Sequence, residues 1–362
     1  MVTATPILTH SKTQFKTIQV FRFVAALMVI LYHSTIYAQE RLSPLFPRYE
    51  SGSRGVHLFF AISGFVMIMS SQELINTEGG WKRFFIRRVI RIVPIYWLLT
   101  TFKVATLLSA SYLVIHNEPV DVLYILKSYF FIPDRSPIGL ILPLYSVGWT
   151  LNFEMLFYLL FTIAMISKSS PIKLLGTIFA ILTILSFYRD PQWPTFLYFY
   201  SDQFVLYFLW GMIAAELVNR NFKMRRPIAV PVILASLVVL FLPRSIFDTE
   251  RFPVLLHLSS FLIVYGAASI ESYLASRMPA ILISLGTASY SLYLIHPLVA
   301  PLPAALIKKL ALDIPWIAVI LGVIFGLVAG YVFFRFCEDP LTKYLNRAAK
   351  RMGLVTAVSS EQ

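Results

Sequence analysis

An arginine and a histidine lie within the first apolar stretch of the chain, residues 16–37, which is long enough to span a membrane. An ionisable side chain in the hydrocarbon costs roughly 3 to more than 10 kcal/mol, so it is expected to face a protein interior or a wet cavity. Arg22 and His33 are eleven residues apart, which places them on one helix face and roughly 16 Å apart along the axis. This helix therefore presents a cation toward one side of the membrane and a titratable base toward the other.

Three further titratable side chains are predicted to lie with His33 in the outer half of the membrane, on three other helices: His57, Glu154 and His296. A carboxylate beside an imidazole orients the ring and stabilises the imidazolium, so His33 and Glu154 are the candidate catalytic residues. A simpler interpretation is that Glu154 neutralises an arginine, and that His57 and His296 are helix-end or interfacial residues. No HxxxH or HExxH motif occurs, and no metal is expected.

Polar and aromatic residues accompany these groups. Glu154 and Tyr158 are four residues apart and form one polar patch on an apolar helix that begins near Trp149. Ser63 precedes a glycine, and this pair would let another backbone approach closely, although helix packing alone explains it equally well. The residues expected to bind substrate are Trp149, Tyr158, His57, Tyr293, His296 and Ser63.

A basic segment, WKRFFIRRVIRIVP at residues 81–94, precedes the third apolar stretch, and we expect it to be a cytoplasmic loop that ends at Pro94. Arg88 and Arg91 are three residues apart and would be neighbours on a helix face. Two guanidinium forks at that spacing suit a bidentate phosphate ligand. The alternative is an anchor in the lipid headgroups. On the outer side, the long connection 116–146 contains the apolar segment 122–132, which is expected to be an interfacial helix or a re-entrant lid.

The composition around these residues is that of a polytopic membrane protein. Of 362 residues, 58% are hydrophobic and 14% are charged, whereas soluble domains carry about 25% charged residues. The single cysteine, Cys337, excludes an intramolecular disulfide framework. The net charge of +13 indicates basic cytoplasmic loops rather than nucleic-acid binding. No signal-peptide cleavage pattern is found, and we expect one domain over residues 1–362, with a core at about 16–341 and a basic cytoplasmic tail at 342–362.

Apolar stretches of about 20 residues predict an all-α fold with about ten transmembrane helices. They lie at residues 17–37, 55–75, 92–115, 147–167, 173–189, 201–219, 227–243, 253–275, 280–297 and 314–337. With the N-terminus inside, the inner segments hold eighteen Lys and Arg residues and the outer segments hold ten. The positive-inside rule then predicts that both termini are cytoplasmic.

The order of these motifs resembles that of bacterial membrane acyltransferase family 3, whose members modify cell-envelope sugars. The similar pieces run from about residue 18 to 340: the Arg22–His33 pair, GVHLFFAISGF (55–65), RRVIRIVPIYW (87–97), GWTLNFEMLFY (148–158), SYSLYLIHP (289–297) and EDPL (338–341). The segment WTLNFEMLFY is most similar to the corresponding segment of the exopolysaccharide O-acetyltransferase branch, the ExoZ-type enzymes. One departure is His57, at a position that is commonly acidic in the family, which leaves the choice of acceptor open.

The resemblance implies an acyl-CoA donor used from the cytoplasm and O-acylation of a sugar at the outer side. It implies a catalytic role for His33, a role in the site for Glu154, and contacts to the donor, acetyl-CoA, for Arg22, Arg88 and Arg91. We therefore expect a multi-pass protein of the bacterial inner membrane. Its expected partners are acyl-CoA, a polysaccharide or lipid-linked sugar acceptor, the lipid bilayer and proteins of polysaccharide assembly, with no nucleic acid.

Two mechanisms and two rival functions stay open at this point. His33 would act as a general base on a sugar hydroxyl or as a transient acetyl carrier, because the unperturbed imidazole pKa of about 6.5 lies near working pH. The first rival is a proton-coupled transporter or flippase of envelope glycans, in which the same groups form a proton relay. The absence of an internal repeat and the arginine pair argue against it. The second rival is a non-catalytic scaffold for polysaccharide export.

Overall fold

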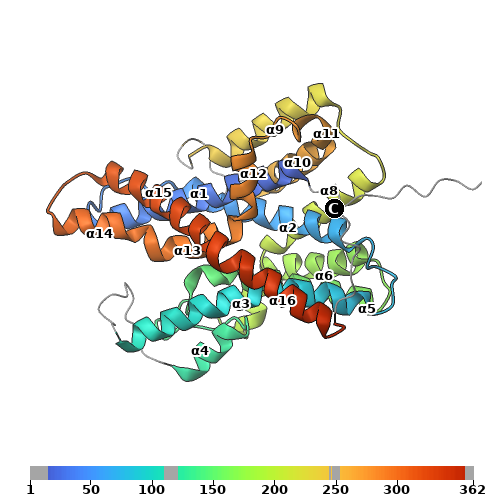
Figure 1. Ribbon diagram of the computed structural model, residues 1–362, viewed down its shortest axis with the longest axis horizontal. Coiled ribbons are helices and arrows are strands. Elements are labelled where there is room, and N and C mark those ends of the chain that lie inside the picture. Colours follow the sequence, from blue (N-terminus) through green and yellow to red (C-terminus); the bar gives the residue numbers. More distant parts are fainter. Residues whose placement is uncertain (1–14, 110–120, 244–245, 247–252, 355–362) are drawn as a thin grey trace, which may run out of the picture.

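The computed structural model describes residues 15–109, 121–243, 246 and 253–354, and these residues form a bundle of helices (Figure 1). The predicted all-α class is confirmed, since the described part of the chain contains no strand beyond one isolated bridge, Arg135 to Ile141. The helices are α1 (Lys16–Arg41), α2 (Gly55–Ser71), α3 (Gly80–Ser109), α4 (Val122–Tyr129), α5 (Trp149–Ile166), α6 (Pro171–Ser186), α7 (Thr195–Tyr200), α8 (Phe204–Asn219), α9 (Arg226–Phe241), α10 (Pro253–Ser269), α11 (Glu271–Leu274), α12 (Ala280–Thr287), α13 (Ser289–Val299), α14 (Pro301–Lys309), α15 (Pro315–Phe333) and α16 (Asp339–Arg351).

Six helical segments of the described residues are long and apolar enough to cross a membrane: Lys16–Arg41, Glu50–Ser71, Gly80–Ser109, Ser146–Ile166, Ser289–Lys309 and Pro315–Arg351. Four apolar helices are shorter, α6, α8, α9 and α10. All ten predicted spans overlap these helices or α12. The number of crossings and the cytoplasmic position of the termini stay predictions.

Two predicted boundaries are wrong. The basic segment 81–94 is helical rather than a loop, because α3 begins at Gly80 and continues through Pro94. A proline is tolerated inside an apolar helix when its neighbours satisfy the backbone group that it frees. The predicted span 280–297 is divided at Ala288 into α12 and α13, and α14 follows α13 directly. Arg88 and Arg91 are consequently fixed on one long helix.

The segment 122–132 does contain a helix, α4, as predicted for an interfacial helix or a lid. Asp121 is its N-cap, because the carboxylate accepts hydrogen bonds from the backbone N–H groups of Leu123 and Tyr124. Tyr96 of α3 donates to the carbonyl of Ser128, which ties α4 to α3. Residues 110–120 of this connection lie outside the described part of the chain.

The first helix starts on a carboxylate from a distant part of the chain. Glu271 of α11 accepts hydrogen bonds from the backbone N–H groups of Lys16, at 2.7 Å, and Thr17, at 3.1 Å, and from the Thr17 hydroxyl. A helix N-terminus leaves N–H groups unsatisfied and carries a partial positive charge, so a carboxylate stabilises it on both counts. This contact fixes the end of α1 on which Arg22 lies.

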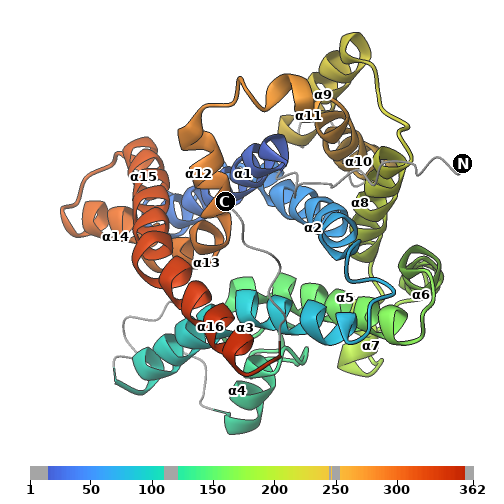
Figure 2. The same ribbon diagram turned by 45° about the vertical axis from the view of Figure 1, so that its right-hand side comes forward.

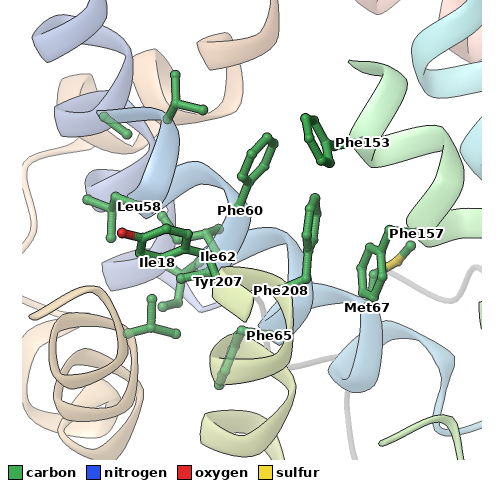
Figure 3. Packing of buried hydrophobic residues seen from close by; sticks show 14 of the residues in the cluster. Ile18, Leu58, Phe60, Ile62, Phe65, Met67, Phe153, Phe157, Tyr207 and Phe208 are labelled. Atoms are coloured by element: carbon green, nitrogen blue, oxygen red, sulfur yellow. The ribbon is translucent and has the colours of Figure 1, made fainter. Parts of the chain in front are cut away.

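The centre of the bundle is the contact between α2 and α8, where two backbones approach without side chains between them. A Cβ at Gly64 would lie 2.0 Å from the Phe208 carbonyl oxygen, and one at Gly211 would lie 1.8 Å from that of Ala61. Figure 3 shows Phe208 between Phe60 of α2 and Phe157 of α5, with 4.5 Å between ring centroids on each side. The core therefore joins α2, α5 and α8, and it holds in place the helix faces that carry Ser63 and Glu154.

This packing predicts a stability effect at Gly211. Gly211→Ala is expected to lower the melting temperature of the detergent-purified protein by several degrees, because overpacking a core typically costs about 1–3 kcal/mol and here the clash is with backbone. The matched control is Gly176→Ala on α6, where the nearest atom would be a Leu209 methyl carbon at 3.6 Å, an ordinary contact. Equal melting temperatures for the two variants would contradict the close α2–α8 contact.

Candidate active site

Two cavities follow one another along α1. The arginine cavity, defined by Arg22, Arg88 and Arg91, has an empty volume of about 730 Å³ and is lined by α1, α2, α3, α5 and α13. The histidine cavity, defined by His33, His57 and His257, is larger at about 1570 Å³. Figure 2 shows the five helices of the arginine cavity arranged about the middle of the bundle. The two ends of the Arg22–His33 face thus border different cavities.

The arginine cavity gathers three guanidinium groups from two helices. Arg22 of α1 donates to the Gln19 side chain at 3.1 Å. Arg88 of α3 donates to the Ser70 hydroxyl, and its guanidinium lies 5.5 Å and 5.9 Å from the ring centroids of Phe84 and Tyr158. Among the described residues, none of the three arginines has a carboxylate within ion-pair distance. Their hydrogen-bonding forks are available to an anionic ligand.

Two carboxylates border this cluster without pairing directly to it. Glu154 accepts hydrogen bonds from the Ser63 hydroxyl at 2.7 Å and from the Tyr158 hydroxyl. Glu338, which is buried, accepts one from the Ser291 hydroxyl and interacts electrostatically with Arg91 and Arg22. Three cations against two carboxylates leave a net positive charge, which is the electrostatic requirement for binding a phosphorylated molecule.

His33 is held by the backbone of its own helix. Its Nδ1 lies 3.0 Å from the carbonyl oxygen of Val29, one turn earlier. A carbonyl can only accept, so Nδ1 carries the proton in this contact and the neutral ring keeps its lone pair on Nε2. His33 also lines the histidine cavity.

Three rings are stacked along one wall of the histidine cavity. His57 of α2 lies on Tyr207 of α8 with 4.5 Å between centroids, and Tyr207 lies on His257 of α10 at 4.1 Å. Beyond them, Arg189 forms an ion pair with Asp202 at 2.9 Å. Flat aromatic surfaces next to charged hydrogen-bonding groups suit a ligand with apolar faces and polar edges.

Two residues, Val56 and Tyr293, line both cavities. The Tyr293 hydroxyl donates to the Val147 carbonyl at 2.9 Å and lies 3.0 Å from the Thr150 hydroxyl. These contacts hold the tyrosine ring where the two cavities adjoin.

The structure brings most of the predicted site residues to these cavities. Arg22, Ser63, Arg88, Arg91, Glu154, Tyr158 and Tyr293 line the arginine cavity; His33, His57, Trp149 and Tyr293 line the histidine cavity. The expected pairing of Glu154 with His33 is not among the described hydrogen bonds. Glu154 contacts Ser63 and Tyr158 instead. His296 lines neither cavity and lies buried behind His33.

Sequence reasoning missed several residues of the site. His257 lies in the apolar stretch 253–275, so the criterion that selected His33, an ionisable group in an apolar helix, would also have found it. Arg54, only 2% exposed, lines the histidine cavity and donates to the carbonyls of Val239, Leu240 and Leu242 at the end of α9. No local pattern predicts that contact, because its partners are some 185 residues away.

The fold and the site agree with the comparisons to known proteins. The family profile described as an acyltransferase domain matches residues 15–335. The chain therefore belongs to this family of membrane acyltransferases. Among its relatives is the exopolysaccharide production protein ExoZ of Rhizobium meliloti (strain 1021), 32% identical over 308 residues, which cover 81% of this chain and 90% of ExoZ. No solved structure matches the chain.

Proposed function

We propose that this protein is an O-acetyltransferase of the bacterial inner membrane that transfers the acetyl group of cytoplasmic acetyl-CoA to a hydroxyl of an exopolysaccharide or its lipid-linked precursor. The observation that carries the proposal is the succession of two cavities along α1, one with three guanidinium groups that have no carboxylate partner among the described residues and one with an imidazole whose Nε2 keeps its lone pair. Membership of the acyltransferase family and the name of its relative, an exopolysaccharide production protein, support the reaction type and the acceptor class.

The arginine cavity would bind the donor. The phosphate groups of acetyl-CoA would lie on Arg88 and Arg91, which are three residues apart on α3, with Arg22 facing them from α1. Guanidinium groups recognise phosphate oxygens in a bidentate manner. The pantetheine arm would then extend along α1 toward Tyr293, and the rise of roughly 16 Å from Arg22 to His33 is the reach that it must cover.

The histidine cavity would bind the acceptor, and the chemistry would take place at its border with the arginine cavity. His33 Nε2 removes the proton of a sugar hydroxyl as its oxygen bonds to the acetyl carbonyl carbon. The carbon–sulfur bond breaks, and the departing CoA thiolate takes up the proton that His33 removed from the hydroxyl. In this direct route the imidazole ends neutral, and one ester and one thiol replace one thioester and one alcohol. Glu154, hydrogen-bonded to Ser63 and Tyr158, would shape the path of the thioester rather than orient His33.

The deciding experiment is a transfer assay on the purified protein. We expect radiolabelled acetyl-CoA and an oligosaccharide of the producing strain to give acetylated sugar and an equal amount of free CoA. In reconstituted vesicles, donor supplied on one side should acetylate acceptor on the other. Movement of the glycan across the vesicle membrane with no loss of thioester would support the transporter instead. If neither reaction occurs, the scaffold becomes the better interpretation.

A further inference from the structure

His296 of α13 contacts the candidate base from behind. Its Nε2 lies 3.3 Å from His33 Nδ1, and the two ring centroids are 4.8 Å apart. The side chain is fully buried, with 0% of its surface exposed, and it lines neither cavity. An interfacial histidine would be in contact with solvent or headgroups, so this burial excludes an interfacial position, although His296 does lie in the last turn of α13.

The protons in this contact can be assigned from its neighbours. His33 Nδ1 carries a hydrogen because it faces the Val29 carbonyl, an acceptor only. The same hydrogen faces His296 Nε2, which must therefore accept, and His296 carries its own proton on Nδ1. The backbone carbonyls of Leu292 and Tyr293, one turn earlier on α13, lie next to this ring, although His296 Nδ1 is buried without a hydrogen-bond partner among the described residues. The neutral pair is thus consistent with one arrangement of hydrogens.

We infer that His296 is a positioning residue, which holds His33 in the tautomer with its lone pair on Nε2 and accepts a hydrogen bond from the imidazolium formed during transfer. The inference rests on the proposed function. In that step the sugar hydroxyl proton moves to His33 Nε2, the new carbon–oxygen bond forms and the carbon–sulfur bond breaks. His33 Nδ1–H stays in place and strengthens its hydrogen bond to His296 Nε2 while the ring is charged. His296 itself neither gains nor loses a proton.

The arrangement differs from a triad in which a carboxylate supports the histidine. No carboxylate of the described residues contacts the His33 ring, whose described hydrogen bonds are those to Val29 and His296. A neutral imidazole supplies the acceptor without placing a second charge in the apolar bundle, where an unpaired carboxylate would be costly. The helix α15 packs closely against α13 one turn before His296, since a Cβ at Gly330 would lie 2.7 Å from Leu292 Cα.

The test compares three replacements of His296 that differ in reach and polarity. Glutamine places an amide oxygen near the position of Nε2, asparagine is too short to do so, and leucine offers no acceptor. We expect His296→Leu and His296→Asn to lower kcat by about 10- to 100-fold with KM for acetyl-CoA changed less than twofold. His296→Gln is expected to recover most of kcat. Melting temperature and acetyl-CoA binding without acceptor serve as controls of folding.

A double variant shows whether His296 acts through His33. Adding His296→Leu to His33→Ala should cause no further loss, because the residue that is being positioned has already been removed. Equal kcat values for the glutamine and asparagine variants, or an undiminished rate in a folded leucine variant, would overturn the inference. A full additive loss in the double variant would do the same. Failure of the wild-type protein to consume acetyl-CoA would instead refute the proposed function.

Discussion

His33→Ala is expected to lower kcat for acetyl transfer by the purified protein about 100- to 10,000-fold, which is the usual contribution of a general base. The reason is geometric: among the described side chains that line the histidine cavity, His33 alone combines a backbone-fixed Nδ1–H with a place on the α1 face that leads from Arg22. The measurement is the rate of acetylated sugar formation at saturating acetyl-CoA. KM for acetyl-CoA should change little, because the arginine cavity is intact.

The control for this variant is Gln39→Ala, on the same helix. Gln39 contacts the Phe46 carbonyl and Arg48 and lines neither cavity, so its loss should leave kcat within about twofold. Incubation of the wild type with labelled acetyl-CoA alone decides between the two roles of His33. A labelled protein that His33→Ala fails to form would indicate an acetyl-histidine carrier, and no label would indicate direct transfer. Undiminished transfer by a folded His33→Ala variant would refute the assignment of the base.

Arg88→Ala and Arg91→Ala each raise KM for acetyl-CoA by about 10- to 100-fold, since a charge-assisted hydrogen bond contributes about 1.5–3 kcal/mol. The effect is expected in binding rather than in chemistry, because in the proposed function these groups bind the donor phosphates, and they line a different cavity from His33. Acetyl-pantetheine, which lacks the nucleotide and its charges, provides the sharper readout. The wild type should strongly prefer acetyl-CoA over this analogue, and the double variant should prefer it only weakly.

Arg83→Ala is the matched control for these variants, because Arg83 lies on the same helix but donates to Thr77 and to the Glu78 carbonyl outside the arginine cavity. Its KM for acetyl-CoA should remain within about twofold of the wild type. Similar increases in all three variants would mean that the effect comes from general surface charge. An unchanged preference for acetyl-CoA in the double variant would place the donor phosphates elsewhere.

Local sequence was sufficient for those features that depend on helical periodicity. The spacing of Arg22 and His33 places them on one face of α1, and the spacing of Arg88 and Arg91 makes them neighbours on α3, whatever surrounds those helices. The cost of a charge in an apolar stretch predicted which side chains face a cavity. That rule holds because lipid surrounds such a helix. An ionisable side chain that faced the lipid would be in an unfavourable environment, so it faces the inside of the bundle instead.

The tertiary structure decided which helix faces contact one another. Glu154 was predicted to support His33, but the packing of α2 against α5 gives it Ser63 as a partner, in addition to Tyr158 one turn further along its own helix. The side chain in contact with His33 Nδ1 is instead that of His296, 263 residues away, and α1 begins on Glu271, 255 residues from Lys16. Such pairings depend on the glycine contacts and aromatic packing that set how closely helices approach, and periodicity along a single helix carries no information about its neighbours.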